Sequence, residues 1–86
     1  MNPIALVVQF LDGREETVEA VASDLIAFEE RFNLSVVKLE TEIRLTHLFF
    51  LAWHACKRLG KTQEEFETWV DSVSIVSQAA EKKSKG

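Results

Sequence analysis

The sequence predicts an α+β domain in which an N-terminal β-hairpin packs on a small helical domain with a central αα-hairpin. Three observations predict this fold class. An Asp-Gly pair separates two extended runs near the N-terminus, which is a strong short-range signal for a β-hairpin. The most apolar run of the chain, residues 46–60, is typical of a central helix. The run that follows it repeats apolar residues at helical spacing.

The predicted hairpin comprises residues 4–11, a turn at Asp12-Gly13 and a return run over residues 15–22. The first run is rich in the β-branched and aromatic residues that favour strands. The return run alternates, so we expect Val18 and Ala20 on a covered face and the acidic side chains mainly towards water. Because a lone hairpin is hardly stable in water, this one must pack on the helices or pair with another chain.

A short helix is predicted over residues 24–32. Ser23 is its expected N-cap, Asp24 brings a negative charge to the first turn, where it complements the helix dipole, and Asn33 is the expected stop. The conformation of residues 34–40 stays open between strand, loop and helix. We treat them as a connection and expect the next helix to begin near Thr41.

The central helix carries apolar residues over more than half of its circumference, so we expect it to be covered on two sides. Lys57 and Arg58 suit the dipole in its last turn, and Gly60 is the expected C-terminal cap. One apolar stripe along this helix comprises Leu45, Leu48, Phe49, Ala52, Cys56 and Leu59.

A second helix is predicted to follow, because Thr62 and Glu65 form a capping box. Aromatic contacts between the two helices should close them into an αα-hairpin. The apolar stripe of the second helix, at positions i, i+3, i+4 and i+7, comprises Phe66, Trp69, Val70 and Val73.

The helical pattern fades from Ser74, so we expect one domain over residues 1–76 and a flexible polar tail over residues 77–86. A chain this short buries only about 60% of the surface that its unfolded form exposes. Hydrophobic residues nevertheless make up 47% of the sequence and include two Trp and six Phe. Part of this apolar surface is therefore expected to meet another copy of the chain or another protein.

The formal net charge of −4 argues against a nucleic-acid-binding protein and against docking on an anionic membrane. No apolar run reaches the roughly 18–20 residues that a membrane span needs, and the N-terminus lacks the basic region of a signal peptide. Cys56 is the only cysteine, so the chain cannot form an intramolecular disulfide and fits a reducing cytoplasm. We expect Cys56 to be a small buried apolar residue.

The histidines do not predict a metal site. His47 and His54 are seven residues apart, about 10 Å along a helix, whereas chelation from one helix needs a spacing of three or four. We expect both to be partly exposed at the edge of a core. The paired acids imply no pocket, and the three glycines are too scattered for a phosphate-binding loop. We therefore expect neither an enzyme nor a cofactor.

The aromatic residues of the two predicted helices are the candidate partner-binding site. Each of these aromatic residues, taken singly, is expected to be buried in the core. Together, however, their apolar surface exceeds what two short helices and a hairpin can cover. Trp and Arg are also the commonest hot-spot residues of protein interfaces. The candidate groove comprises Phe50, Trp53, Phe66 and Trp69, with His54 and Arg58 at its rim.

A motif of the form FLAW-x-A-x-KR-x-G, then F-x-x-W-x-x-x-V, runs through both predicted helices. It comprises Phe50-Leu51-Ala52-Trp53, Ala55, Lys57-Arg58, Gly60, Phe66, Trp69 and Val73. A weaker match upstream comprises Asp24, Ala27, Phe28 and Glu29, and the N-terminal hairpin also fits. In these features the chain resembles the short tail assembly chaperones of long-tailed bacteriophages, especially those of phages of actinobacteria and related hosts.

The resemblance implies a non-structural assembly factor. Such chaperones hold the long, helical tape measure protein in solution until tail tube subunits polymerise around it. In many members a programmed frameshift also makes a longer product that recruits tail tube protein. The resemblance thus implies the tape measure protein as partner, the cytoplasm of the infected host as location, and absence from the mature virion. The client could instead add a strand to the hairpin edge.

Two other readings stay open. The first is a small homo-oligomeric phage adaptor or regulator, whose hairpins pair into a shared sheet and whose partner is a host or virion protein. The second is a DNA-binding helix-turn-helix, because residues 41–73 form two predicted helices with a short turn. The second of those helices carries Glu64, Glu65, Glu67 and Asp71, which phosphates would repel.

Overall fold

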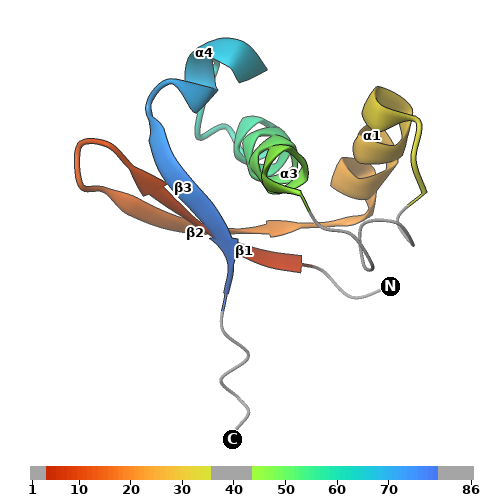
Figure 1. The fold of residues 1–86 in the computed structure, drawn as a ribbon, viewed down its shortest axis with the longest axis horizontal. Helices are drawn as coiled ribbons and strands as arrows, with labels where there is room; N and C mark the ends of the chain where they lie inside the picture. The colour runs from red at the N-terminus through yellow and green to blue at the C-terminus, as the bar shows by residue number, and fades with distance from the viewer. Residues whose placement is uncertain (1–3, 36–43, 80–86) are drawn as a thin grey trace, which may run out of the picture.

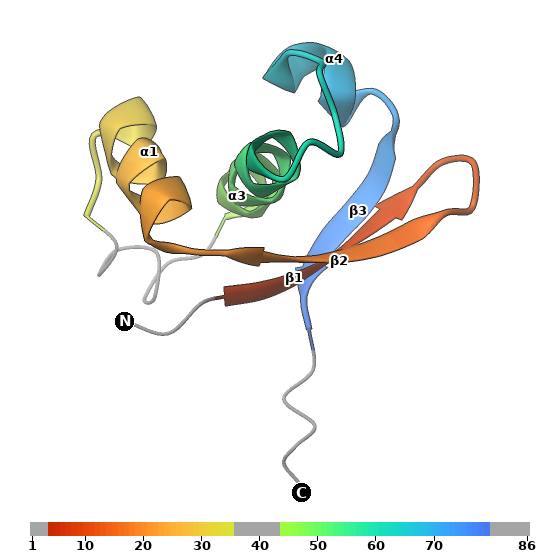
Figure 2. The same ribbon diagram turned by 180° about the vertical axis from the view of Figure 1, so that it is seen from behind.

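The computed structural model describes residues 4–35 and 44–79. Its three strands form one antiparallel sheet of order β2-β1-β3, and its helices lie together on one face of that sheet (Figures 1 and 2). The chain is therefore α+β, as the sequence predicts. The elements follow in the order β1 (Ile4–Phe10), β2 (Glu15–Ala20), α1 (Ala22–Phe32), α3 (Leu45–Arg58), α4 (Phe66–Val70) and β3 (Val73–Gln78).

The predicted hairpin is present as β1 and β2. Gly13 takes a φ of 97°, which only glycine adopts without strain, and its amide donates to the carbonyl of Phe10 at 3.0 Å. The Phe10 amide in turn donates to the carbonyl of Arg14 at 2.9 Å, which closes the turn. Val18 and Ala20 are buried on the face towards the helices, as the alternation predicts.

Strand β3 corrects two predictions. Val73 was expected to end the second helix, and residues 77–86 were expected to form a tail. Instead, residues 73–78 pair antiparallel with β1, so that Val76 lies opposite Val8, and Ser77 and Gln78 belong to the sheet. The physical reason is the free edge of β1, which a segment rich in β-branched residues can cover while its valines join the core. Residues 80–86 of the expected tail lie outside the described residues.

The second helix, α4, is shorter than predicted and begins later. Thr62 is not its N-cap: the Thr62 hydroxyl accepts from the amide of Glu64 at 3.2 Å, and Glu65 stands at the N-cap position. The helix ends after five residues, where the hydroxyl of Ser72 donates to the carbonyl of Trp69 at 2.8 Å. The predicted αα-hairpin is thus a long helix followed by a single short turn of helix.

The ends of α1 and α3 were predicted with mixed success. The N-cap of α1 is Val21 and not Ser23, because the Val21 amide donates to the Asp24 carboxylate at 2.8 Å. Asn33 ends α1 in the left-handed conformation, as predicted. Helix α3 begins at Leu45, later than the expected start near Thr41, and residues 36–43 lie outside the described residues.

Helix α3 is the centre of the described fold and contacts every other helix and strand in it. Gly60 caps its end as predicted, with a φ of 79°. The amides of Gly60 and Lys61 donate back to the carbonyls of Lys57 and Cys56, the bond pattern of a Schellman motif. The expectation of cover on two sides is confirmed, since the sheet lies on one side of α3 and α1 and α4 on the others (Figure 1). Among the described residues, no helix is long and apolar enough to cross a membrane.

Candidate functional site

The aromatic side chains of the predicted groove are mostly buried. Phe50, Trp53 and Trp69 are only 3%, 9% and 2% exposed, and Phe66 is half-buried. The expectation that the four form an open patch is therefore wrong for three of them. Phe50 is covered by both neighbouring helices, because its ring lies 5.5 Å from that of Phe32 in α1 and 5.8 Å from that of Phe66 in α4.

These side chains form two separate clusters. The Phe66 ring lies 5.8 Å from the ring of Phe50 and 5.7 Å from that of Trp53, so aromatic contacts join α3 to α4 as predicted. The indole Nε1 of Trp53 also donates to the carbonyl of Glu64 at 2.9 Å. Trp69 instead packs edge-on against the rings of Phe10 and Phe49, at 6.2 and 6.5 Å.

The ring of His54 lies beside those of Phe50 and Trp53, at 5.9 and 6.0 Å, and both His54 and Arg58 also bind Asp24 of α1. Nδ1 of His54 lies 2.6 Å from Oδ1 of Asp24, and Nη2 of Arg58 donates to Oδ2 at 3.0 Å. Because a carboxylate only accepts, His54 carries a proton on Nδ1. Arg58 also donates to the carbonyl of Glu19 in β2 at 2.9 Å. The predicted rim residues therefore tie α3 to α1 and to the sheet.

Asp24 is completely buried, which sequence reasoning missed. Burial by itself raises the pKa of this carboxyl. The hydrogen bonds from Arg58, His54 and the Val21 amide, together with the attraction of Arg58, outweigh burial and hold the pKa below its ordinary value of 3.8. The available signal was the spacing of His54 and Arg58, because donors four residues apart share one helix face and can meet one acceptor.

Two other titratable side chains, Cys56 and His47, are buried in the core. Burial raises the pKa of the Cys56 thiol to about 11, so this sulfur is an inert core group, as expected. His47 was expected to be partly exposed but is 5% exposed and packs edge-on against Phe28 and Phe32. Within residues 4–35 and 44–79, no group of three or more His, Cys, Asp or Glu could hold a metal ion.

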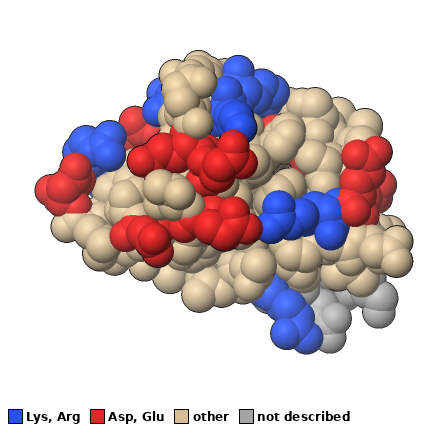
Figure 3. Space-filling model, turned by 90° about the horizontal axis from the view of Figure 1, so that it is seen from above, with Lys and Arg blue, Asp and Glu red and all other residues tan. Residues whose placement is uncertain are grey.

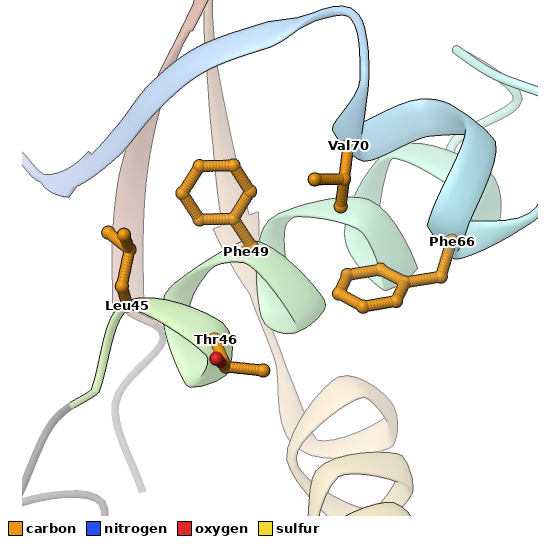
Figure 4. Close-up of a pocket in the computed structure, with 5 residues that line it drawn as sticks. All are labelled: Leu45, Thr46, Phe49, Phe66 and Val70. Carbon is orange, nitrogen blue, oxygen red and sulfur yellow. The ribbon is translucent and has the colours of Figure 1, made fainter.

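An apolar groove opens between the first turns of α3 and the face of α4, with a volume of about 290 Å³ (Figure 4). We call it the α3–α4 groove. Leu45 at its edge is 56% exposed, although the sequence places this residue on the predicted core stripe. Phe66 is the only member of the predicted site that lines it. The lining residues are Leu45, Thr46, Phe49, Phe66 and Val70.

Charged side chains stand beside Phe66, at one end of the α3–α4 groove. The guanidinium of Arg31 lies 5.3 Å from the centre of the Phe66 ring, at a distance typical of a cation–π contact. Arg31 also pairs with Glu67 at 3.5 Å, and both side chains are exposed. The groove thus has an apolar floor and a polar border, which is the usual composition of a protein-binding site. No protein-family model matches this chain, and neither the curated proteins nor the solved structures include a match.

Proposed function

We propose that this protein is a tail assembly chaperone of a long-tailed bacteriophage, which binds the tape measure protein and keeps it soluble until the tail tube polymerises. The observation that carries the proposal is the α3–α4 groove, an exposed apolar surface on a small domain. The sequence supplies the second support, through its resemblance to this class of chaperone over both helices.

A shallow groove suits a chaperone that must let go of its client. An amphipathic helix can lay its apolar face into such a groove, and the long tape measure helix would offer many of these faces in succession. Each module would bury little surface and bind weakly, so polymerising tail tube protein could displace the modules one after another. In this proposal the protein works in the host cytoplasm and is absent from the virion.

The test of the proposal is co-expression with the tape measure candidate, the longest helical protein encoded just downstream, followed by size exclusion of the soluble fraction. A chaperone makes the candidate soluble and elutes with it in a large complex. If the candidate is equally insoluble with and without this protein, the proposal is wrong, provided that a longer frameshifted product has also been supplied.

A second candidate function, a homo-oligomeric adaptor, is favoured by the composition of the sheet edges. The edge strand β2 carries Glu15, Glu16 and Glu19, which discourage pairing with another chain. The other edge strand, β3, has the sequence VSIVSQ and no charged residue. Two copies could pair there into one continuous sheet. Light scattering that finds a closed, concentration-independent oligomer without affinity for the tape measure candidate would favour the adaptor.

A further inference from the structure

The two walls of the α3–α4 groove have the same spacing. On α3, Leu45 and Phe49 are four residues apart, and on α4, Phe66 and Val70 are four residues apart (Figure 4). Residues at this spacing lie one above the other on a helix face. The groove is therefore a channel between two helical ridges, which is the shape into which the i, i+4 ridge of a third helix packs.

An acidic stripe runs along the outer side of this channel. Glu67 and Asp71 directly follow Phe66 and Val70 in the sequence, so they lie about 100° further round α4. Trp69 points the other way, into the core, and leaves both acids exposed. Glu64 and Glu65 add two more exposed carboxylates where the chain enters α4.

In the part of the chain that the structure describes, the cations around the groove are fewer than these acids. Arg31 pairs with Glu67, and Arg44 is exposed next to Leu45 at the start of α3. Asp71 has no ion-pair partner among the described residues. Figure 3, which looks onto the helical face, shows acidic side chains near the middle of that face, with Lys and Arg side chains beside them. A helix in the groove would therefore have carboxylates along its flank.

We infer that the α3–α4 groove selects an amphipathic helix with apolar residues four apart and Lys or Arg beside them. This inference rests on the proposed function and names the part of the client that is bound. Opposite charges at the rim of an interface speed association and exclude partners of the wrong sign, while the apolar floor supplies most of the affinity. An acidic amphipathic helix is accordingly rejected.

The test uses two alanine-based helical peptides that share the same leucine pairs four residues apart. One peptide carries Lys on both flanks of the leucines, and the other carries Glu at the same positions. Binding to the full chain is measured by fluorescence anisotropy. At about 0.01 M salt the Lys peptide should bind about fivefold or more tightly than the Glu peptide, and at about 1 M salt the difference should vanish.

Two variants that each remove two acidic charges show which carboxylates cause the preference for the Lys peptide. Glu67→Gln/Asp71→Asn removes the acidic stripe and should reduce the preference for the Lys peptide to about twofold or less. Glu15→Gln/Glu19→Gln removes two exposed acids from β2, away from the groove, and should keep the preference. Equal loss in both variants would mean that net charge, and not the stripe, attracts the peptide, and would overturn the inference.

The outcomes separate this inference from the proposed function. If the Glu peptide binds as well as the Lys peptide, or if neither binds while the tape measure candidate still co-elutes, the inference is wrong and the chaperone proposal stands. If the Lys peptide binds selectively but the candidate stays insoluble, the groove chemistry is as inferred and the chaperone proposal is wrong.

Discussion

At the residue scale, the carboxylate of Asp24 joins three parts of the fold. It accepts hydrogen bonds from the amide of Val21 and from His54 and Arg58 of α3, and Arg58 continues to the carbonyl of Glu19 in β2. A buried charge is tolerated only when its hydrogen-bonding capacity is used in this way. Removing it leaves the guanidinium of Arg58 without its main partner.

We predict that Asp24→Asn lowers the free energy of unfolding by about 3 kcal/mol, near the lower end for a broken buried ion pair. We use the lower end of that range of free energies because the Arg58 side chain is 30% exposed and is therefore partly hydrated. Urea unfolding measures the change. The control is the substitution Asp12→Asn, because the Asp12 side chain is 61% exposed and this substitution should change the free energy of unfolding far less. Equal effects of the two substitutions would contradict the role given to Asp24.

The lowered pKa of Asp24 also predicts a pH dependence. Because the folded pKa lies below the ordinary value of 3.8, the stabilisation is fully present above that value and is lost as the pH falls through the folded pKa. The gap in unfolding free energy between the wild type and Asp24→Asn should therefore shrink as the pH is lowered from 5 to 2. Urea titrations across this range measure it, and a constant gap would refute the prediction.

The residues of the β-turn and of two helix C-termini were predictable from the sequence, whereas the N-caps predicted at Ser23 and Thr62 were wrong. Gly13, Asn33 and Gly60 each occupy the left-handed backbone conformation at the turn or helix end where the sequence places them. Such preferences depend on the residue itself and on its immediate neighbours. The burial of Asp24 was not predictable in the same way, because it depends on donors 30 and 34 residues further along the chain.

At the element scale, β3 is the strand that the helical spacing of apolar residues does not predict. Phe66, Trp69, Val70 and Val73 keep a helical spacing, which favours one longer helix. Yet the chain leaves the helix after Val70, and Val73 becomes the first residue of a strand. The six residues of β3 are too few for their pattern to decide, and the free edge of β1, more than 60 residues earlier, decides instead.

A pair of neighbouring substitutions tests the strand. Val76 is 2% exposed and faces the helices, whereas Ile75 is 36% exposed on the other face of the sheet. We predict that Val76→Ala lowers the free energy of unfolding by about 2 kcal/mol and that Ile75→Ala costs less than about 1 kcal/mol, although it removes the larger side chain. Urea unfolding compares them. A larger loss for Ile75→Ala would contradict the assigned faces.

At the scale of the whole molecule, composition predicted an exposed apolar surface but not its position. The sequence predicts that surface at Phe50, Trp53, Phe66 and Trp69, of which Phe66 alone is not buried. Which aromatic rings stay exposed depends on how α1, α4 and β3 pack around α3, and the helical spacing of the sequence carries no information about that packing. The α3–α4 groove contains Phe66 from that set and adds Leu45, which the sequence places on the predicted core stripe.

The most direct test of the central claim compares two leucines on α3 during co-expression with the tape measure candidate. Leu45 borders the α3–α4 groove and is 56% exposed, whereas Leu59 stands at the far end of the helix and is 50% exposed. We predict that Leu45→Gln sharply reduces the candidate recovered in the soluble complex and that Leu59→Gln leaves it unchanged. Equal recovery with both variants, each shown to be folded, would contradict the assignment of the groove as the client site.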